Sequence, residues 1–328
     1  MQLRAIFISS FLALAAAPAW AEVDFEAVGP YAHENLSVFL LRSKSAPTLK
    51  KKYLTLAQAL KEKKVKVHET GDVNTLAVEN DSSEDVYLQA GDIVKGGRQD
   101  RTLGTDLILP RKSGKVPIAA FCVESGRWSQ RRGENAQRFE SSTAALATKS
   151  LKVAARKSKN QGEVWKEVEV TQAKLSKNVA APVQSAVSAS SLELSLENEK
   201  VKHTAEEYKK ALVDVPAKVP DAIGFAFAIN GQMNSAEVYG SPELFRSMWP
   251  KLLESSAIEA LAERDQKATQ AATVEDVKRL VSTPVTAPSA KKEKPAAKVS
   301  VTTNDTGKNT VFETRDDDSP EWVHRSYY

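Results

Sequence analysis

A pair of glycines followed by arginines is the part of this sequence best suited to binding chemistry. The residues concerned are Gly96, Gly97, Arg98, Gln99, Asp100 and Arg101. Adjacent glycines allow successive backbone N–H groups to point into one concavity, an arrangement that binds anions. Nearby arginines can add two-pronged hydrogen bonds to phosphate or carboxylate. Because the spacing fits neither common phosphate-loop motif, the alternative is a turn in which Asp100 pairs with Arg98 or Arg101.

A second run combines a thiol, a carboxylate, a guanidinium and an indole in Cys122, Glu124, Arg127 and Trp128. On a strand, Cys122 and Glu124 would share one face. A nucleophilic thiol needs a positioned base, most often histidine; none is adjacent, so a buried structural cysteine is favoured. We expect Glu124 and Arg127 to form an ion pair with Trp128 packed on the guanidinium. Arginine and tryptophan together also suit flat anionic or aromatic ligands.

The remaining composition narrows the classes of function. Cys122 is the single cysteine, which excludes an intramolecular disulfide and a multi-cysteine zinc site. The four histidines lack metal-binding spacing, so we expect neither a metal nor a cofactor. Residues 95–138 hold ten Lys or Arg and four acids, but base-stacking aromatics are scarce there. Nucleic acid is therefore not an expected partner.

The N-terminus has the three parts of a bacterial export signal. Arg4 precedes an apolar run over 5–17, and small residues flank Trp20 in an A-x-A pattern. The run is too short to span a bilayer comfortably, and no later segment is long and apolar enough to do so. We therefore expect residues 1–21 to be a cleaved signal peptide. The mature protein should be periplasmic or secreted, without a membrane span.

The first half of the chain, from residue 22 to about 133, has the short segments of an antiparallel β structure. The strand candidates are 36–41, 65–68, 74–78, 86–88, 107–109 and 116–122. Turn residues separate them, and Thr55 with Gln58 has the spacing of a capping box that opens a short helix. Strands at this spacing predict a sandwich or a small barrel.

The second half changes to helical periodicity but contains the clearest hairpin signal. Asn230-Gly231 joins two strand candidates, 223–229 and 232–239, with the chemistry of a type I′ turn. A serine–proline pair at 241–242 then starts a helix, which Pro250 should kink or split. The predicted fold class is α+β, with an antiparallel β-rich N-terminal half and a helical C-terminal half that holds one hairpin.

After residue 282 the composition shifts to proline, alanine and lysine. Such a composition is typical of an extended, flexible linker, and the polar end of the chain is expected to be disordered in isolation. The prediction is therefore one globular domain over 22–282, whose last helix, 274–280, is capped by Thr273. A flexible linker and tail over 283–328 would follow it.

Three segments carry a resemblance to a known family. They are 53–60 (YLTLAQAL), 96–101 (GGRQDR) and 122–128 (CVESGRW), in this order. Together they resemble the ARG-and-rhodanese-phosphatase-superfamily-associated protein domain of bacteria and archaea. The resemblance covers roughly residues 30–265 and implies no activity, cofactor or catalytic residue. It does imply that the two arginine motifs belong together and that their segments meet in space.

We hypothesise that the chain is an exported binding protein for an anionic small molecule or an acidic partner. The ligand-binding residues would be Gly96, Gly97, Arg98, Gln99, Asp100, Arg101, Cys122, Glu124, Arg127 and Trp128. One alternative is a hydrolase that uses Asp100 with Glu124, or Cys122. Another is an envelope protein whose partner is a second protein.

Overall fold

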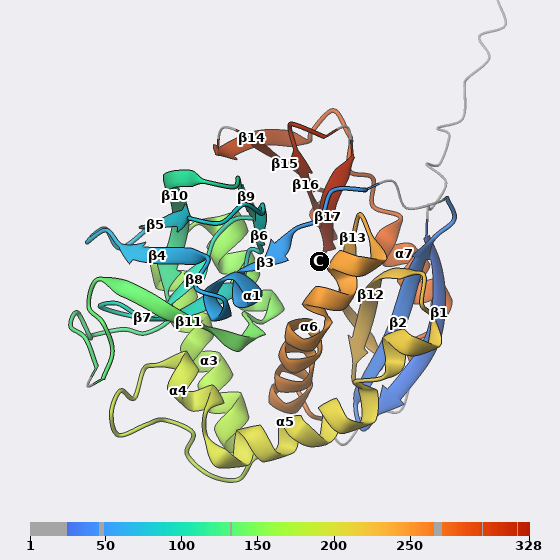
Figure 1. The fold of residues 1–328 in the computed structure, drawn as a ribbon. Helices are drawn as coiled ribbons and strands as arrows, with labels where there is room; N and C mark the ends of the chain where they lie inside the picture. The colour runs from blue at the N-terminus through green and yellow to red at the C-terminus, as the bar shows by residue number, and fades with distance from the viewer. Residues whose placement is uncertain (1–24, 46–48, 132, 266–270, 297, 320) are drawn as a thin grey trace, which may run out of the picture.

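The computed structural model describes the chain except for residues 1–24, 46–48, 132, 266–270, 297 and 320. The predicted signal peptide, 1–21, lies outside the described residues. Strands form a closed barrel on one side of the molecule and an eight-stranded sheet on the other (Figure 1). Helix α6 (Pro242–Ala262) lies between them. The fold class is α+β with a strand-rich N-terminal half, as the sequence predicts.

The barrel contains six strands in the order β10-β5-β4-β11-β7-β8. Their bounds are β4 Val65–Glu69, β5 Thr75–Asn80, β7 Asp92–Gly96, β8 Arg101–Leu103, β10 Ser113–Cys122 and β11 Arg138–Leu146. A small sheet of β3 (Leu54–Thr55), β6 (Val86–Leu88) and β9 (Leu107–Leu109) contacts it. Every strand candidate of this half is confirmed, and the barrel is the one of the two predicted architectures that is found. The predicted capping box opens helix α1 (Leu56–Lys61).

The eight-stranded sheet has the order β1-β2-β12-β13-β17-β16-β15-β14. Its strands are β1 Phe25–His33, β2 Leu36–Ser43, β12 Ala222–Ile229, β13 Gln232–Tyr239, β14 Lys291–Ala296, β15 Val299–Asp305, β16 Thr310–Asp316 and β17 Trp322–Tyr327. The hairpin of β12 and β13 is confirmed. Its turn residues Asn230 and Gly231 have φ of 52° and 76°, as a type I′ turn requires.

The flexible linker and tail predicted over 283–328 are wrong for most of that segment, because it supplies four strands of the sheet. β17 pairs with β13 on one side and with β16 on the other. The prolines and lysines that suggested a linker lie mainly before and on β14, the exposed edge strand, where lysine and proline are common protection against edge pairing. Beyond β14, buried residues such as Val299, Val311 and Val323 anchor the remaining strands in the core.

The other helices pack around these two β assemblies. They are α2 Lys149–Val153, the π-helical turn η1 Ala154–Ser158, α3 Gln161–Asn178, α4 Leu192–Leu196, α5 Glu199–Leu212, the 3-10 turn η2 Val215–Lys218 and α7 Val274–Val281. Thr273 caps α7, as predicted. Of the two effects predicted for Pro250, a kink or a split, the split is wrong, since α6 continues through it. Pro250 and Arg246 are both exposed, so water can satisfy the carbonyl group that loses its helical partner.

Among the described residues, three buried apolar clusters hold the fold together. The largest fills the barrel and continues along α5 and α6 to one face of the sheet. A second lies between the opposite sheet face and α7, and a third lies between the barrel wall and the helices η1, α3 and α4. The sheet therefore has apolar clusters on both faces, and β12 is buried along its whole length. No helix among the described residues has the length and apolar character needed to cross a membrane.

Candidate functional site

The two arginine motifs of the sequence meet in the barrel. β7 ends at Gly96 and β8 begins at Arg101, so the Gly-Gly-Arg segment is a tight connection between neighbouring strands. β8 also pairs with β10, where Cys122 lies opposite Arg101. The expectation that the two segments meet in space is confirmed.

The backbone donors of this connection are occupied by the protein itself. The N–H of Gly96 donates to Oδ1 of Asp100 at 3.1 Å, and the N–H of Arg98 donates to Oε2 of Glu69 at 3.2 Å. The N–H of Gly97 donates to a main-chain carbonyl of the loop before β11. The concavity therefore holds a side chain of the same segment, Asp100, in the place that a bound anion would take.

Gly97 is required here for packing. Its φ of 58° lies in the left-handed region, and a Cβ at this position would lie 2.4 Å from the ring of Phe139. Glycine therefore lets the loop pass directly over an aromatic ring of β11. This is a structural reason for a glycine in the motif.

Around Asp100 lies a largely buried set of five charged residues, here called the Arg131 network: Asp100, Glu124, Arg127, Arg131 and Glu134. Arg127 binds Glu124 with two hydrogen bonds, from Nε to Oε1 at 2.7 Å and from Nη2 to Oε2 at 2.6 Å. Arg131 donates from Nη2 to Oδ1 of Asp100 at 2.6 Å and from Nε to Oε1 of Glu134 at 2.9 Å. The predicted Glu124–Arg127 ion pair is confirmed, whereas Asp100 bonds Arg131 rather than Arg98 or Arg101.

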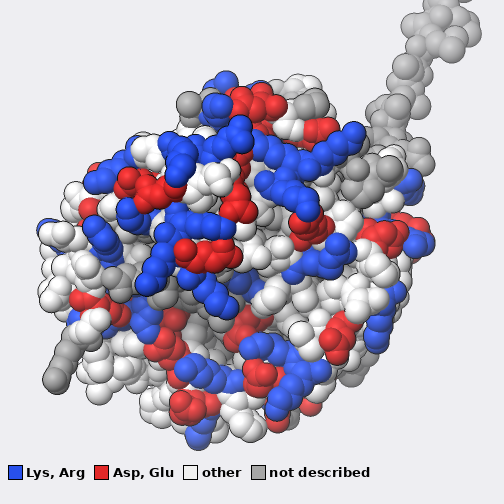
Figure 2. All heavy atoms as spheres, viewed as in Figure 1, with Lys and Arg blue, Asp and Glu red and all other residues white. Residues whose placement is uncertain are grey.

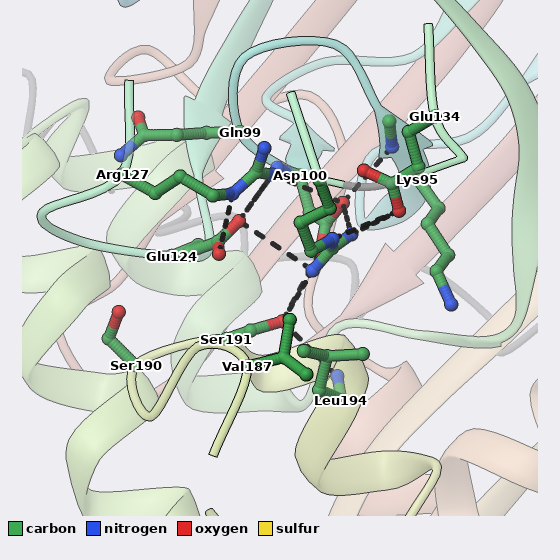
Figure 3. Close-up of polar contacts among 12 residues, drawn as sticks. Lys95, Gln99, Asp100, Glu124, Arg127, Glu134, Val187, Ser190, Ser191 and Leu194 are labelled. Atoms are coloured by element: carbon green, nitrogen blue, oxygen red, sulfur yellow. Dashed lines mark hydrogen bonds and ion pairs between the residues drawn. The ribbon is translucent and has the colours of Figure 1, made fainter. Parts of the chain in front are cut away.

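The network is tied to helix α4 through Ser191, the residue that caps it. Ser191 donates its hydroxyl to Oδ2 of Asp100 at 3.3 Å and accepts a hydrogen bond from Arg131 at 3.2 Å. Figure 3 shows Glu124 and Arg127, from the segment after β10, close to Asp100, with Ser191 nearby at the start of α4. The network therefore joins the barrel to a helix, which is a structural role.

The acids of this network keep their arginine partners despite burial. Burial raises the pKa of Asp100 although Arg131 opposes that shift. Burial also disfavours ionised Glu124, but the hydrogen bond from Arg127 and further polar contacts hold the pKa of Glu124 below its ordinary value. With every residue ionised, three carboxylates face two guanidinium groups. An additional anion would be repelled rather than bound.

Trp128 packs on two other arginines of the motif. The guanidinium carbons of Arg98 and Arg101 lie 5.5 and 5.4 Å from its ring centroid, so the expected packing of Trp128 on Arg127 is wrong. Arg101 is fully buried and lies 3.5 Å from Oε2 of Glu69, whereas Trp128 is 42% exposed. Counting these residues with the Arg131 network gives four arginines and four carboxylates, so the wider region is neutral.

The remaining predicted site residues are buried and bonded within the barrel. Gln99 is 4% exposed, and its carbonyl accepts a hydrogen bond from Arg101. Cys122 is fully buried, and burial raises the pKa of its thiol to about 11. Its backbone bonds the side chain of Gln161 on α3. At neutral pH Cys122 is therefore a protonated thiol in a structural position.

A second buried set of charges lies where the barrel meets the eight-stranded sheet. It is here called the His324 cluster: Asp106, Lys152, Arg156, Glu237 and His324. His324 on β17 lies with Nδ1 2.8 Å from Oδ2 of Asp106 and Nε2 2.8 Å from Oε2 of Glu237. Lys152 on α2 donates to Oε1 of Glu237 at 2.7 Å. All five residues are at most 6% exposed.

The geometry requires a charged imidazolium at His324. Each ring nitrogen faces a carboxylate oxygen, and both nitrogens donate only when the ring carries two protons. Burial opposes that charge, but Asp106 and Glu237 together raise the pKa of His324. Both carboxyl groups remain ionised: burial would raise their pKa, yet Arg156 and His324 lower that of Asp106. Lys152 and His324 bring the pKa of Glu237 to about 2.

The His324 cluster therefore has one positive charge in excess, with three cations against two carboxylates. Two acid–base sets at its border, Asp92 with Lys251 and Glu259 near Lys149, are each balanced and leave the excess unchanged. A buried net charge costs several kcal/mol unless a counter-ion or hydrogen bonds compensate it.

Arg156 is the member of the cluster whose hydrogen bonds are incomplete. Its Nη1 donates to the hydroxyl of Ser326 at 3.1 Å. Its Nη2 lies 3.5 Å from Oδ2 of Asp106, an ion pair without a hydrogen bond, and Nε has no acceptor among the described residues. Since buried guanidinium donors are normally satisfied, two donors remain available on a side chain that is 6% exposed.

Arg156 lines a cleft of about 860 Å³, here called the Arg156 cleft. One wall is the barrel at β8 and β10, another is η1, and the third is formed by β14, β15 and β16. Its residues are Gly104, Thr105, Ala119, Phe121, Ala155, Arg156, Lys157, Lys159, Ser289, Lys291, Glu293, Pro295, Val301, Thr303, Asp305 and Phe312. Small-molecule sites often occupy clefts of this size between structural units.

None of the cleft residues belongs to the site predicted from the sequence. Arg156 lies in no recognisable motif, and His324 lies in the segment that was expected to be a flexible tail. The available signal is the basic pair Lys152 and Arg156 four residues apart, which places both on one helical face. Their acidic partners are distant in sequence, so only the fold brings them together.

The described residues thus form an α+β protein whose cleft lies beside a buried, positively charged cluster. The family model of the ARG and Rhodanese-Phosphatase-superfamily-associated Protein domain matches residues 24–328. The chain therefore belongs to this family. The match extends through β14–β17, beyond the range of the resemblance seen in the sequence. No curated protein and no solved structure matches the chain.

Proposed function

We propose that the protein binds an anionic small molecule in the Arg156 cleft. The observation that carries this proposal is the pair of buried donors on Arg156, Nε and Nη2, which have no hydrogen-bond acceptor among the described residues. An anion placed there would accept both hydrogen bonds in the two-pronged geometry that arginine favours. It would also neutralise the excess positive charge of the His324 cluster.

The Gly-Gly-Arg loop supports this function less well. The N–H groups of Gly96 and Arg98 already bond acidic side chains. The guanidinium of Arg101 pairs with Glu69, and that of Arg98 lies over the ring of Trp128. Surface charge offers no substitute on the face drawn in Figure 2, where basic and acidic side chains are interspersed. We therefore move the proposed site from the loop to the cleft and retain the anionic character of the ligand.

The hydrolase alternative receives little support from the geometry. Asp100 and Glu124 each bond an arginine, so neither is free to activate water. The thiol of Cys122 is buried and protonated at neutral pH. A protein partner on the envelope remains the second candidate function and becomes the preferred one if no anion binds.

The test is thermal unfolding of the purified chain with phosphate, sulfate and citrate, at ionic strength held constant with chloride. An anion present at 100 times its dissociation constant should stabilise the fold by about 2.7 kcal/mol. The stabilisation should disappear in Arg156→Gln and persist in Arg127→Gln, the matched variant in the Arg131 network. The proposal would be contradicted if no anion stabilised the fold. It would also be contradicted if the stabilisation were lost in Arg127→Gln but kept in Arg156→Gln.

We also propose that the protein acts after export, on the basis of residues 1–21. The mature chain should then begin at Glu22. Mass spectrometry of the protein from fractionated bacteria tests this directly. Recovery of the intact N-terminus from the cytoplasm would contradict it.

A further inference from the structure

We infer that the ligand of the Arg156 cleft is an anion with a flat apolar part, such as an aromatic phosphate or carboxylate. This inference rests on the proposed function and names the chemical class of its ligand. The observation behind it is that the cleft joins one basic inner group to apolar walls. An inorganic anion would bond the basic group and leave the apolar walls in water.

The apolar and the basic parts meet at Phe312. The guanidinium carbon of Arg156 lies 3.9 Å from the ring centroid of Phe312, so the ring covers one face of the guanidinium. Tyr328 holds the ring from another side in an edge contact, with centroids 5.9 Å apart. This stacking orients the plane of Arg156, whose Nε and Nη2 are buried and have no hydrogen-bond acceptor among the described residues.

Phe121 on β10 forms the facing apolar wall together with Ala119. Its ring lies against the barrel because Gly104 has no side chain: a Cβ there would lie 2.7 Å from Cε2 of Phe121. The space for a ligand therefore depends on a glycine of the barrel. With Val301 and Phe312 on the opposite wall, the cleft offers apolar surface on two sides.

Two of the three lysines at the rim are paired with acids of the β14–β15 hairpin, and the third, Lys291, is exposed on β14. Lys157 pairs with Asp305 at 2.6 Å, and Lys159 pairs with Glu293 at 3.0 Å. Both pairs connect the end of η1 to the β14–β15 hairpin. Arg156 is therefore the only arginine or lysine of the cleft that is both buried and short of acceptors in the part of the chain that is described.

The size of the cleft argues for more than a small inorganic ion. Sites for organic ligands measure about 300–1,000 Å³, and this cleft measures about 860 Å³. A ring in contact with the apolar walls removes surface from water on both partners, and each removed Å² contributes favourably. The anionic group alone cannot gain that contribution.

The experiment compares matched probes on the purified chain by isothermal titration: inorganic phosphate with phenyl phosphate, and acetate with benzoate. The aromatic member of each pair should bind about tenfold more tightly or better. Arg156→Gln should weaken both members of a pair. Phe312→Leu and Gly104→Ala should reduce the preference for the ring, the second by pushing Phe121 into the cleft. Arg127→Gln is the control and should bind as wild type does.

The outcomes separate this inference from the proposed function. Equal binding of phosphate and phenyl phosphate, lost for both in Arg156→Gln, would overturn the aromatic ligand and retain the anion site. Absence of binding by all four probes would overturn both. Tight binding of the aromatic probes that Arg156→Gln leaves unchanged would also overturn both, because the ligand would then lie elsewhere. The probe comparison is made on the wild-type chain, so it holds even if a variant fails to fold.

Discussion

The Arg131 network and the His324 cluster are built from the same kinds of side chain, yet they differ in how completely their charges are matched. In the Arg131 network every arginine bonds a carboxylate, and the carboxylates are in excess by one. In the His324 cluster the cations are in excess by one, and two donors of Arg156 have no acceptor within the described part of the chain. The first set lies against helix α4, while the second borders a cleft.

The difference distinguishes a structural set of charged residues from a candidate binding site. A buried network whose members satisfy one another fixes structure, because each removed partner would leave a charge uncompensated. An incomplete network beside a cavity has an energetic reason to bind something. The more conspicuous motif in the sequence is thus the structural one, and the functional candidate is assembled from residues far apart in the chain.

We expect the largest loss of stability from a substitution of Asp100 in the Arg131 network. Asp100→Ala removes the partner of Arg131, the acceptor for the N–H of Gly96 and a bond of Ser191. Loss of one partner from a buried ion pair should lower the free energy of unfolding by about 3–5 kcal/mol. Urea denaturation measures this. Glu26→Ala, in an exposed pair with Arg42, is the control and should leave the midpoint unchanged; equal effects would contradict the account.

A matched pair of substitutions compares the two regions directly. Arg127→Met removes both hydrogen bonds that Arg127 makes to Glu124 in the Arg131 network. It should lower the free energy of unfolding by about 2 kcal/mol. Arg156→Met removes the excess charge of the His324 cluster and leaves Asp106 bonded to His324 and Thr314. We expect a change within about 1 kcal/mol, because relief of the unsatisfied charge offsets the lost packing. Urea denaturation of both variants measures the two changes in the free energy of unfolding. A larger loss of stability in Arg156→Met than in Arg127→Met would contradict the assignment of roles.

Glu193 on α4 should make the stability of the protein depend on pH. Burial, with the charge of Glu197 beside it, raises the pKa of Glu193 to about 8, and its Oε2 has no hydrogen-bond partner among the described residues. The unfolded chain ionises near pH 4.5 while the folded chain stays protonated, so folding loses stability as pH rises from about 4.5 to about 8. Glu193→Gln should therefore stabilise the protein by about 1–2 kcal/mol at pH 7.5 and by little at pH 4.5. Urea curves at the two pH values test it, and an equal shift at both would exclude this explanation.

His324 should give a smaller effect with a defined sign. Its ring faces Asp106, Glu237, Tyr87 and Tyr239, and the two carboxylates raise its pKa. The stabilisation it contributes is complete below its unfolded pKa of about 6.5 and is lost as pH rises through the folded pKa. The stability advantage of wild type over His324→Gln should therefore shrink as the pH rises above about 6.5. His203→Gln, at an exposed position on α5, should show no such trend, and an advantage that grows with pH would refute the ion-pair assignment.

Local patterns predict the local parts of this fold well. The capping box at Thr55, the hairpin at Asn230 and the strands of the barrel follow from turn chemistry and alternation, which act over a few residues. Strands β14–β17 were missed because the composition before and on β14 is typical of linkers. The strand that joins them to the rest of the sheet, β17, pairs with β13, which lies far away in the chain. The candidate site was missed for the same reason: Arg156 meets Asp106 and His324 only after the barrel and the sheet have packed together.

The central claim is that an anion occupies the N–H edge of Arg156. The most direct measurement is a crystal structure of the protein soaked with selenate, whose anomalous scattering locates the anion without reference to its surroundings. We predict a peak within hydrogen-bonding distance of Nε and Nη2 of Arg156, absent from crystals of Arg156→Gln. A peak at Arg98 or Arg127 with none in the cleft would contradict the account and return the site to the Gly-Gly-Arg loop.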